Sequence, residues 1–390
     1  MAQINLPRRR FMHLLAGAAA LPALYVPSSV SAQPSPPTET AEPTQSERAE
    51  MSNLARAFMQ RYAMPGLSVA VGRAGAILYE DAFGWADLDA REAVSPTHLF
   101  RIASVTKPIT SVALFSLIEE GRIRLTDKIF GPGAITDTDY GDPPYHPRVD
   151  QITVEHLLTH TSGGWTNDAA DPMFMNLEMN QAQLIESTLR NRPLDQPPGR
   201  HYAYSNFGYC VLGRVIERIT QQNYAIYVRD SVLKRCGITD MTIAGNTLAQ
   251  RHPGEVKYYD PQDEREPYAM DIARMDSHGG WIARPRDLVH FLMHVSGFAT
   301  PPNILEPQSI RTMTTASAAN PEYAKGWSVN KFDNWWHTGS LPGTSTIAVR
   351  THSGFCWAAF GNGGRLNAPL DRDLDNLIWD MVRQVKSWHA

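Results

Sequence analysis

Cysteine is scarce in this chain, which holds only Cys210, Cys236 and Cys356 among its 390 residues. Three thiols do not make a disulfide framework, and their positions do not match the ligand spacing of a metal site. Each cysteine lies among apolar neighbours, as Cys210 does between Tyr209 and Val211. We therefore expect three buried thiols that act as small apolar side chains.

An excess of basic charge is also missing. The formal net charge is −4, and no dense cluster of Lys and Arg follows Arg10. This composition argues against a nucleic acid or an anionic membrane as partner. With 43% hydrophobic and 19% charged residues, the chain has the composition of a globular protein of about two domains in length.

The sequence has no apolar run long enough to span a membrane. Leu14–Val26 is apolar but contains Pro22, and a spanning helix needs about 20 apolar residues. This stretch follows Arg8-Arg9-Arg10-Phe11-Met12 and precedes Val30-Ser31-Ala32, which resembles a twin-arginine export signal with a cleavage site. We expect residues 1–32 to be such a signal peptide, and the mature protein to be periplasmic or secreted. A Sec signal with a coincidental Arg run is the alternative.

Residues 33–46 are rich in Pro, Ser and Thr, so they predict a linker ahead of a folded domain over 47–385. Within that domain, strand patterns occur near both ends and helical or loop patterns fill about 120–275. Strands are expected at 66–71, 77–83, 326–330, 335–338, 346–350 and 355–360, and helices from about 47, at 109–118, 211–219 and 374–385. The pattern predicts an α/β fold: a sheet built from both chain ends, flanked by helices, with an inserted and mainly helical domain.

The first motif with chemical meaning is Ser104-Val105-Thr106-Lys107, at the entry to the apolar helix. Positions three apart share one face of a helix, so Lys107 can point at the Ser104 hydroxyl and accept its proton. A Ser at a helix start also places its N–H among donors that can hold an oxyanion. An N-cap Ser with a surface Lys is the alternative reading, and Pro108 within the expected helix has no explanation at this level.

Two weaker motifs follow along the chain. In Tyr204-Ser205-Asn206, a phenol can move protons and an amide can orient both Lys107 and a substrate. In His337-Thr338-Gly339-Ser340, a Gly-containing strand end can align a substrate amide, and the Ser340 N–H can supply a second oxyanion donor. His337 and Thr338 are candidates to bind a substrate carboxylate.

The order and spacing of the three motifs resemble the serine β-lactamase-like superfamily. This group includes class C β-lactamases, DD-peptidases of the carboxypeptidase type and family VIII carboxylesterases. The resemblance runs from about residue 50 to 385 and includes Phe83–Asp87, Phe100–Ala103, Thr153–Gly164, Gly279–Trp281 and Gly361-Asn362. It implies an antiparallel β-lactamase/transpeptidase-like sheet with an inserted helical domain.

The resemblance also implies roles for single residues. Ser104 is the expected nucleophile, Lys107 and Tyr204 the acid/base pair, and Asn206 an orienting group. His337 stands where true β-lactamases carry Lys. The N–H groups of Ser104 and Ser340 are expected to form the oxyanion hole.

Other candidate residues have simpler interpretations. His156 and His160 are four apart, but no Glu follows His156, so the zincin pattern is absent and we expect neither metal nor cofactor. His278 is more consistent with a loop or an interface than with the site. Several Trp residues suit core packing better than a substrate pocket: Trp165, Trp281, Trp327, Trp335 and Trp336.

These observations predict a serine hydrolase that forms an acyl-enzyme on Ser104 and hydrolyses esters or D-amino-acid amides and peptides. The expected partner is a small-molecule or peptide substrate, cell-wall material included. A neutral His337 attracts a carboxylate less steadily than Lys does, and its charge is expected to change near pH ~6.5. A class C-type β-lactamase and a non-catalytic homologue that binds peptidoglycan or a protein are the alternatives.

Overall fold

The computed structural model describes residues 42–141, 143–260, 266–364 and 368–388. The expected signal peptide, residues 1–32, and most of the expected linker lie outside the described residues. The first helix begins at Gln45, where the Thr44 hydroxyl and the Glu47 carboxylate cap each other's backbone N–H groups.

Strands follow the first helix of the domain, helices fill most of its middle, and strands occur again before its last helix. The helices are α1 (Gln45–Tyr62), α2 (Thr106–Glu119), α3 (Val154–Leu158), α4 (Gln181–Asn191), α5 (Asn206–Thr220), α6 (Tyr224–Val228), α7 (Pro285–His294), α8 (Pro307–Thr314) and α9 (Ala368–Gln384). The strands are β1 (Gly66–Arg73), β2 (Ala76–Asp87), β3 (Glu92–Ala93), β4 (Phe100–Arg101), β5 (Thr242–Ile243), β6 (Trp281–Ala283), β7 (Ser328–Val329), β8 (Trp335–Leu341), β9 (Thr344–Arg350) and β10 (Phe355–Gly361).

One seven-stranded sheet joins the two ends of the domain, in the order β3-β2-β1-β10-β9-β8-β7. Strand β1 pairs antiparallel with β10, so that Val69 lies opposite Ala359 although they are far apart in sequence. The predicted fold class, an antiparallel sheet built from both ends, is therefore confirmed. Strand β7 is shorter than expected, because Gly326 turns with a positive φ of 88° just before it.

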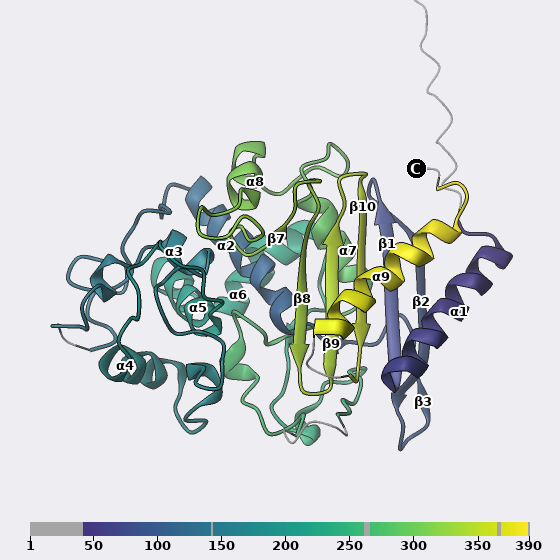
Figure 1. The fold of residues 1–390 in the computed structure, drawn as a ribbon, viewed down its shortest axis with the longest axis horizontal. Helices are drawn as coiled ribbons and strands as arrows, with labels where there is room; N and C mark the ends of the chain where they lie inside the picture. The colour runs from purple at the N-terminus through teal and green to yellow at the C-terminus, as the bar shows by residue number, and fades with distance from the viewer. Residues whose placement is uncertain (1–41, 142, 261–265, 365–367, 389–390) are drawn as a thin grey trace, which may run out of the picture. The chain divides into compact units, whose positions relative to one another are not determined.

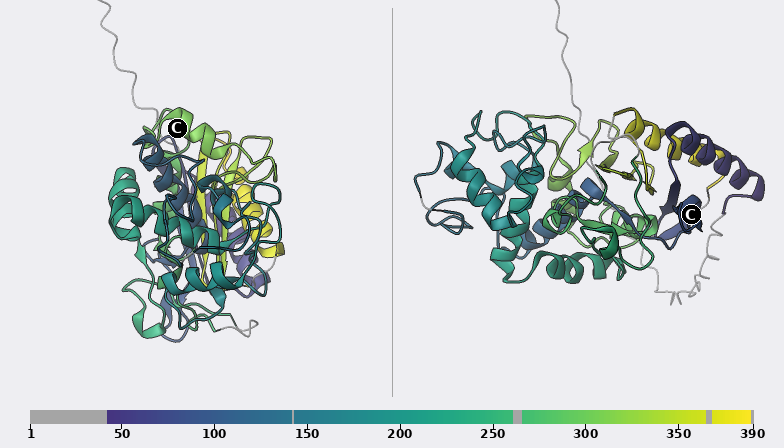
Figure 2. Two further views of the ribbon diagram at one scale, coloured as in Figure 1. Left: turned by 90° about the vertical axis from the view of Figure 1, so that its left-hand side faces the viewer. Right: turned by 90° about the horizontal axis from the view of Figure 1, so that it is seen from below.

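Helices cover both faces of the sheet. Figure 1 shows α1 and α9 crossing in front of the strands and α7 lying behind them, and both views in Figure 2 keep α1 and α9 together on one side. Apolar residues of β1, β9 and β10 pack against α1 and α9 on one face, and other residues of the same strands pack against α7. Burial on both faces explains why β1 reads as a nearly continuous apolar run.

The region from about 120 to 275 contributes α3, α4, α5 and α6 beyond the end of the sheet formed by β8 and β7 (Figure 1), with β5 as its strand among the described residues. Strand β5 pairs with β6 and β6 with β4, which makes a small separate sheet. This small sheet positions the site, because the chain leaves β4 directly into the turn that carries Ser104.

Candidate active site

Ser104 lies in the short 3-10 helix η1 (Ala103–Val105), which connects β4 to α2. Ala103 has a φ of 46°, a left-handed conformation that is costly for a residue with a Cβ. The preceding residue is held on both sides: the Ile102 N–H donates to Trp281 O at 2.9 Å, and Ile102 O accepts from Thr346 Oγ1 at 2.9 Å. These bonds fix the strained turn that presents Ser104 to solvent.

The structure also explains Pro108. Helix α2 begins at Thr106, so Pro108 occupies the first turn rather than the second. The backbone N–H groups of a first turn have no partner within the helix, so the missing N–H of proline costs no hydrogen bond there.

Lys107 is fully buried and directed at the partly exposed Ser104. Its Nζ lies 3.0 Å from Ser104 Oγ, 2.8 Å from Asn206 Oδ1 and 3.1 Å from the carbonyl oxygen of His278. Burial lowers the pKa of Lys107 to about 7, although the nearby Asp171 carboxylate opposes this change. Near neutral pH, Lys107 can therefore lose its proton and accept the proton of Ser104.

Asp171 belongs to this network, and no motif of the sequence indicated it. Its Oδ2 accepts from Asn206 Nδ2 at 2.8 Å, and its Oδ1 accepts from the Met173 N–H at 2.9 Å. The side chain is 1% exposed, and burial raises its pKa. Asn206 itself is the first residue of α5, whose N-cap Ser205 accepts from the Gly208 N–H at 3.0 Å.

Tyr204 lies on the other side of Lys107, whose Nζ is 4.8 Å from the centre of the phenol ring. Burial raises the pKa of Tyr204 well above its usual range, and a hydrogen bond with Ser104 only partly offsets this. Tyr204 is therefore a neutral phenol at physiological pH. A neutral phenol bonded to Ser104 can donate or relay a proton, whereas Lys107 is the better acceptor.

Strand β8 runs directly beside the Ser104 turn. A Cβ added to Gly339 would lie 2.3 Å from Ile102 O and 3.1 Å from Ser104 N, so only glycine allows this approach. Ser340 lines the same cavity as Ser104. Burial alternates along β8, so that His337 and Gly339 are buried while Thr338 and Ser340 are partly exposed.

The structure corrects the expected behaviour of His337. Its Nδ1 lies 2.6 Å from Thr338 O and its Nε2 lies 3.1 Å from the Tyr323 hydroxyl. Burial, reinforced by the charge of Lys107, lowers the pKa of His337 to about 3. The expectation that its charge changes near pH 6.5 was wrong, because burial and the nearby charge of Lys107 both disfavour the protonated ring.

A cavity of about 220 Å³ opens in front of Ser104. Among the described residues, it is lined by Ala103, Ser104, Asn167, Phe174, Asn206, Met275, His278, Gly279, Ser340, Leu341 and Pro342. No Asp, Glu, Lys or Arg of the described chain belongs to this lining, and burial keeps the pKa of His278 well below its usual range. The cavity therefore offers apolar walls and neutral hydrogen-bonding groups around the serine.

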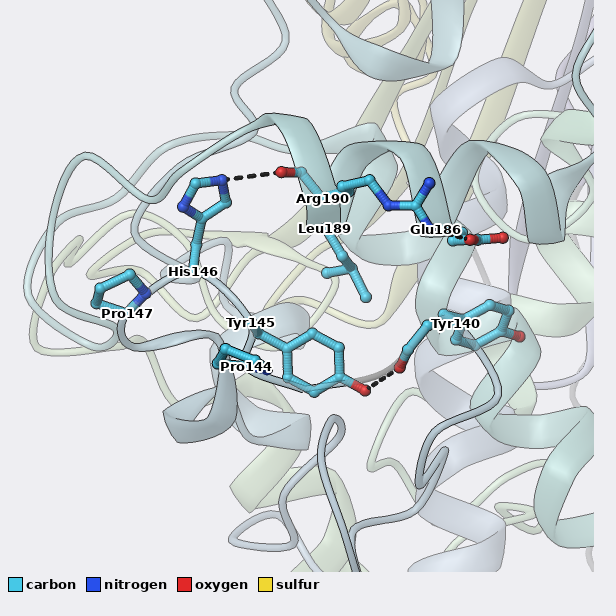
Figure 3. A pocket seen from close by; sticks show the side chains of 9 residues that line it. Tyr140, Pro144, Tyr145, His146, Pro147, Glu186, Leu189 and Arg190 are labelled. Atoms are coloured by element: carbon cyan, nitrogen blue, oxygen red, sulfur yellow. Dashed lines mark hydrogen bonds and ion pairs between the residues drawn. The ribbon is translucent and has the colours of Figure 1, made fainter.

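Figure 3 shows a second cavity, of about 210 Å³, between α4 and the segment that precedes α3. His146 Nε2 lies 3.0 Å from Arg190 O there, and Tyr145 donates to Gly141 O at 2.7 Å. None of the predicted site residues lines it. It has no serine or lysine, so it cannot carry out the acyl transfer expected from the motifs.

His278 was expected in a loop or an interface, but it lines the Ser104 cavity and its carbonyl oxygen accepts from Lys107 Nζ, so that expectation was wrong. The remaining candidates take part in packing. His156 Nδ1 accepts from the Thr153 N–H at 3.2 Å at the start of α3, and across the described ranges no group of three or more His, Cys, Asp or Glu is placed to hold a metal ion. Four of the five Trp residues are buried, and none of the five lines the Ser104 cavity. The three cysteines are buried free thiols.

Comparison with known proteins decides the family. A family model described as Beta-lactamase matches residues 51–378. The chain belongs to the beta-lactamase family. This confirms the resemblance read from the three motifs and places the protein in a superfamily of serine hydrolases.

Curated relatives of this chain are matched over only part of their own length. Protein flp of Staphylococcus aureus (strain MW2) is 25% identical over 299 residues, which cover 75% of this chain and 58% of that protein. The uncharacterized protein MT1414 of Mycobacterium tuberculosis is 30% identical over 259 residues, covering 61% and 64%. The chain thus spans less than two thirds of these relatives.

Solved structures share the fold of this beta-lactamase family member. The D-amino acid amidase of Ochrobactrum anthropi SV3 has a TM-score of 0.72 at 20% identity, covering 88% of this chain and 99% of that one. The octameric penicillin-binding protein homologue of Pyrococcus abyssi has a TM-score of 0.69 at 20% identity, covering 85% and 77%. Within the described residues, no helix has the length and apolar character that crossing a membrane requires.

Proposed function

We propose that this protein is a serine hydrolase that forms an acyl-enzyme on Ser104 and hydrolyses esters or D-amino-acid amides and peptides. The observation that carries the proposal is the 3.0 Å contact between Ser104 Oγ and Lys107 Nζ, with the pKa of Lys107 lowered to about 7. This pairs a nucleophile with a base that is neutral at the pH where it works.

In the proposed reaction, Ser104 Oγ attacks the substrate carbonyl carbon and its proton passes to Lys107 Nζ. The N–H groups of Ser104 and Ser340 stabilise the resulting oxyanion. Tyr204, hydrogen-bonded to Ser104, relays that proton from Lys107 to the leaving alcohol or amine as the carbonyl re-forms and the C–O or C–N bond breaks, which leaves Lys107 neutral again. Water then attacks the ester on Ser104 and its proton passes to Lys107. Ser104 Oγ leaves as Lys107 returns that proton to it.

The lining of the cavity supports uncharged substrates. Phe174, Met275 and Leu341 form apolar walls, and no ionised side chain of the described residues is placed there to pair with a carboxylate or an ammonium group. A neutral His337 also differs from the Lys that true β-lactamases carry at this position. We therefore propose that, within this range of substrates, esters and amides with a neutral acyl group are hydrolysed faster than amides with a free ammonium group and faster than the carboxylate-bearing β-lactams.

The first experiment compares the protein with Ser104→Ala on three substrates: p-nitrophenyl butyrate, D-phenylalanine amide and benzylpenicillin. Turnover of the ester or the amide, absent from Ser104→Ala, together with an acyl adduct on the intact protein by mass spectrometry, supports the proposal. L-phenylalanine amide tests the stereochemical preference. Tyr204→Phe is expected to lower kcat by ~10²–10⁴-fold.

Other outcomes would identify an alternative. Rapid hydrolysis of benzylpenicillin and nitrocefin would indicate a class C-type β-lactamase. No turnover and no adduct with any of the three substrates would favour a non-catalytic homologue that binds peptidoglycan or a protein.

We also propose export to the periplasm or beyond through the twin-arginine route, supported by Arg8-Arg9-Arg10-Phe11-Met12 and the apolar stretch after it. Replacing Arg8 and Arg9 with Lys tests the route in a bacterial host. Accumulation of full-length precursor in the cytoplasm supports it, whereas unchanged processing points to Sec export.

A further inference from the structure

Three buried side chains meet beside the candidate active site. The hydroxyl of Tyr323 lies 3.1 Å from His160 Nε2 and 3.1 Å from His337 Nε2. His160 follows α3, Tyr323 precedes β7 and His337 lies in β8, so the contact joins three distant parts of the chain. All three side chains are buried, and His160 holds a left-handed φ of 56° to reach its place.

The backbone groups at the two ends determine the direction of every hydrogen bond in this cluster. The Ser205 N–H donates to His160 Nδ1 at 3.1 Å, so the proton of His160 is on Nε2 and is donated to Tyr323. At the other end, a carbonyl can only accept, so His337 Nδ1 donates to Thr338 O and His337 Nε2 is an acceptor. The Tyr323 hydroxyl must then accept from His160 and donate to His337.

Neighbouring groups are compatible with this direction. The Tyr209 hydroxyl is also hydrogen-bonded to Tyr323, but its own proton is donated to Leu158 O at 2.9 Å. It can therefore only accept from Tyr323, alongside His337 Nε2, and cannot supply a proton to Tyr323. Burial, reinforced by the charge of Lys107, keeps the pKa values of His160 and His337 low, so both rings are neutral. A neutral ring has one donor and one acceptor nitrogen, as the chain requires at both positions.

The ends of the chain are next to the reacting groups. Ser205 lies between Tyr204 and Asn206, and Thr338 precedes Gly339 and Ser340 in β8. His160 also contacts the Tyr204 segment directly: its ring packs against the phenol at a tilt of 39° with centroids 4.2 Å apart, and its carbonyl accepts from the Ala203 N–H at 2.8 Å. The segment that presents the phenol is thereby connected to the strand that carries the expected oxyanion donor.

We propose that Tyr323 is a positioning residue of this active site, which fixes Tyr204 relative to β8 through the directed chain Ser205 N–H, His160, Tyr323, His337 and Thr338 O. Tyr323 does not touch the cavity lined by Ser104, so it acts through the groups that it connects. The role in turnover rests on the proposed function, whereas the direction of the hydrogen bonds does not.

The direction of the hydrogen bonds between Ser205 N–H and Thr338 O can be tested without any variant of Tyr323. In ¹⁵N-edited NMR spectra of the whole protein, His160 is expected as the Nε2–H tautomer and His337 as the Nδ1–H tautomer. His160→Gln and His337→Gln assign the two sets of signals. Opposite tautomers support the chain, and finding His337 as the Nε2–H tautomer overturns it.

The positioning role is tested with Tyr323→Phe, which keeps the ring and removes both hydrogen bonds. On p-nitrophenyl butyrate, kcat is expected to fall ~10–100-fold while KM stays within about twofold, because orientation of the reacting groups is lost and the acyl pocket is kept. The Nε2–H signal of His160 should move upfield or broaden by exchange. Unchanged kcat in Tyr323→Phe overturns the positioning role.

Tyr202→Phe is the matched control. Tyr202 belongs to the same aromatic cluster, with its ring centre 5.5 Å from that of Tyr323, and its hydroxyl has no hydrogen-bond partner in the part of the chain that the structure describes. In Tyr202→Phe, kcat and the tautomer signals of His160 and His337 should equal those of the parent. If they change as in Tyr323→Phe, ring packing accounts for the effect and the proposal is wrong. Ester turnover that survives in Ser104→Ala would contradict the proposed function instead. The tautomers of His160 and His337 would still show whether the directed hydrogen bonds through Tyr323 exist.

Discussion

Asn206 donates from Nδ2 to Oδ2 of Asp171 over 2.8 Å, and this contact determines which end of the amide faces Lys107. A carboxylate accepts hydrogen bonds and cannot donate them, so it binds the NH₂ end and leaves Oδ1 free. That oxygen then accepts from Lys107 Nζ at 2.8 Å. The buried carboxylate thus orients the partner of the candidate base from behind.

Asp171→Asn should lower kcat/KM for a neutral ester by ~10–100-fold, because the Asn206 amide can then turn and present a donor to Lys107. The acid limb of the pH profile should also move to lower pH. The Asp171 charge raises the pKa of Lys107, so its removal lowers that pKa further below about 7.

Asp168→Asn serves as the control for this loop. Asp168 is exposed and accepts from the Ala170 N–H at 2.7 Å. Asp168→Asn should keep the kcat/KM and the pH profile of the parent. An acid limb that stays in place or moves upward in Asp171→Asn would argue against an effect of Asp171 on Lys107.

The pH dependence of the parent should reflect Lys107 and not His337. The base is active when neutral, so kcat/KM should rise with pH through about 7 and fall about tenfold per pH unit below it. The pKa of His337 is about 3, so this ring should add no inflection between about pH 5 and 8. Rates measured from pH 5 to 9 on p-nitrophenyl butyrate test this, and loss of the inflection in His337→Gln would assign it to His337 instead.

Gly339→Ala should disable the site and weaken the fold. The added methyl group would meet Ile102 O at 2.3 Å and Thr346 Oγ1 at 2.4 Å, so the Ser104 turn must move. We expect a loss of about 1–3 kcal/mol in the free energy of unfolding from overpacking and a fall of ~100-fold in kcat/KM from misplacement of the nucleophile. Urea unfolding and ester kinetics measure the two effects.

Gly208→Ala is a useful comparison, because a Cβ there meets neighbours at 3.6 Å or more. Its position within α5 should make the substitution neutral or slightly stabilising. Equal losses in both variants would mean that general sensitivity to added volume, and not the close approach of β8, explains the result.

Asp375 on α9 should make stability depend on pH. Burial raises its pKa to about 6, so the protonated carboxyl contributes stability below the ordinary value near 3.8, and this contribution is lost as pH rises through about 6. Asp375→Asn stays neutral, so its Tm relative to the parent should increase by roughly 2 °C between pH 5 and 8.

Asp380→Asn on the same helix is the control, because it removes an exposed carboxylate, which pairs with Arg383 at 3.0 Å, instead of a buried one. Thermal unfolding of both variants at the two pH values provides the measurement. A difference in Tm between Asp375→Asn and the parent that is the same at pH 5 and pH 8 would show that ionisation of Asp375 does not affect folding.

Local pattern was sufficient to predict much of the fold. The apolar spacing at Leu54, Phe58 and Tyr62 predicted a helix, and α1 spans these residues. Alternation and apolar runs predicted β1 and β10, because strands buried on both faces have a composition that sequence alone reveals. The exact start of α2 was not predictable, since the 3-10 turn that precedes it depends on bonds from Trp281 and Thr346, residues far along the chain.

The sequence by itself determined the main strands near both ends of the domain, the helices α1, α2, α5 and α9, the three motifs and the pairing of Ser104 with Lys107, because each depends on residues close together in the chain or on a distinctive spacing. Only the tertiary structure decided what surrounds these groups. Asp171 stands in no motif, and Tyr323 comes between His160 and His337 only once three separate segments are folded together. Burial and the charges of distant residues set the pKa values of Lys107 and His337, and both arise from contacts between residues that the linear sequence keeps far apart.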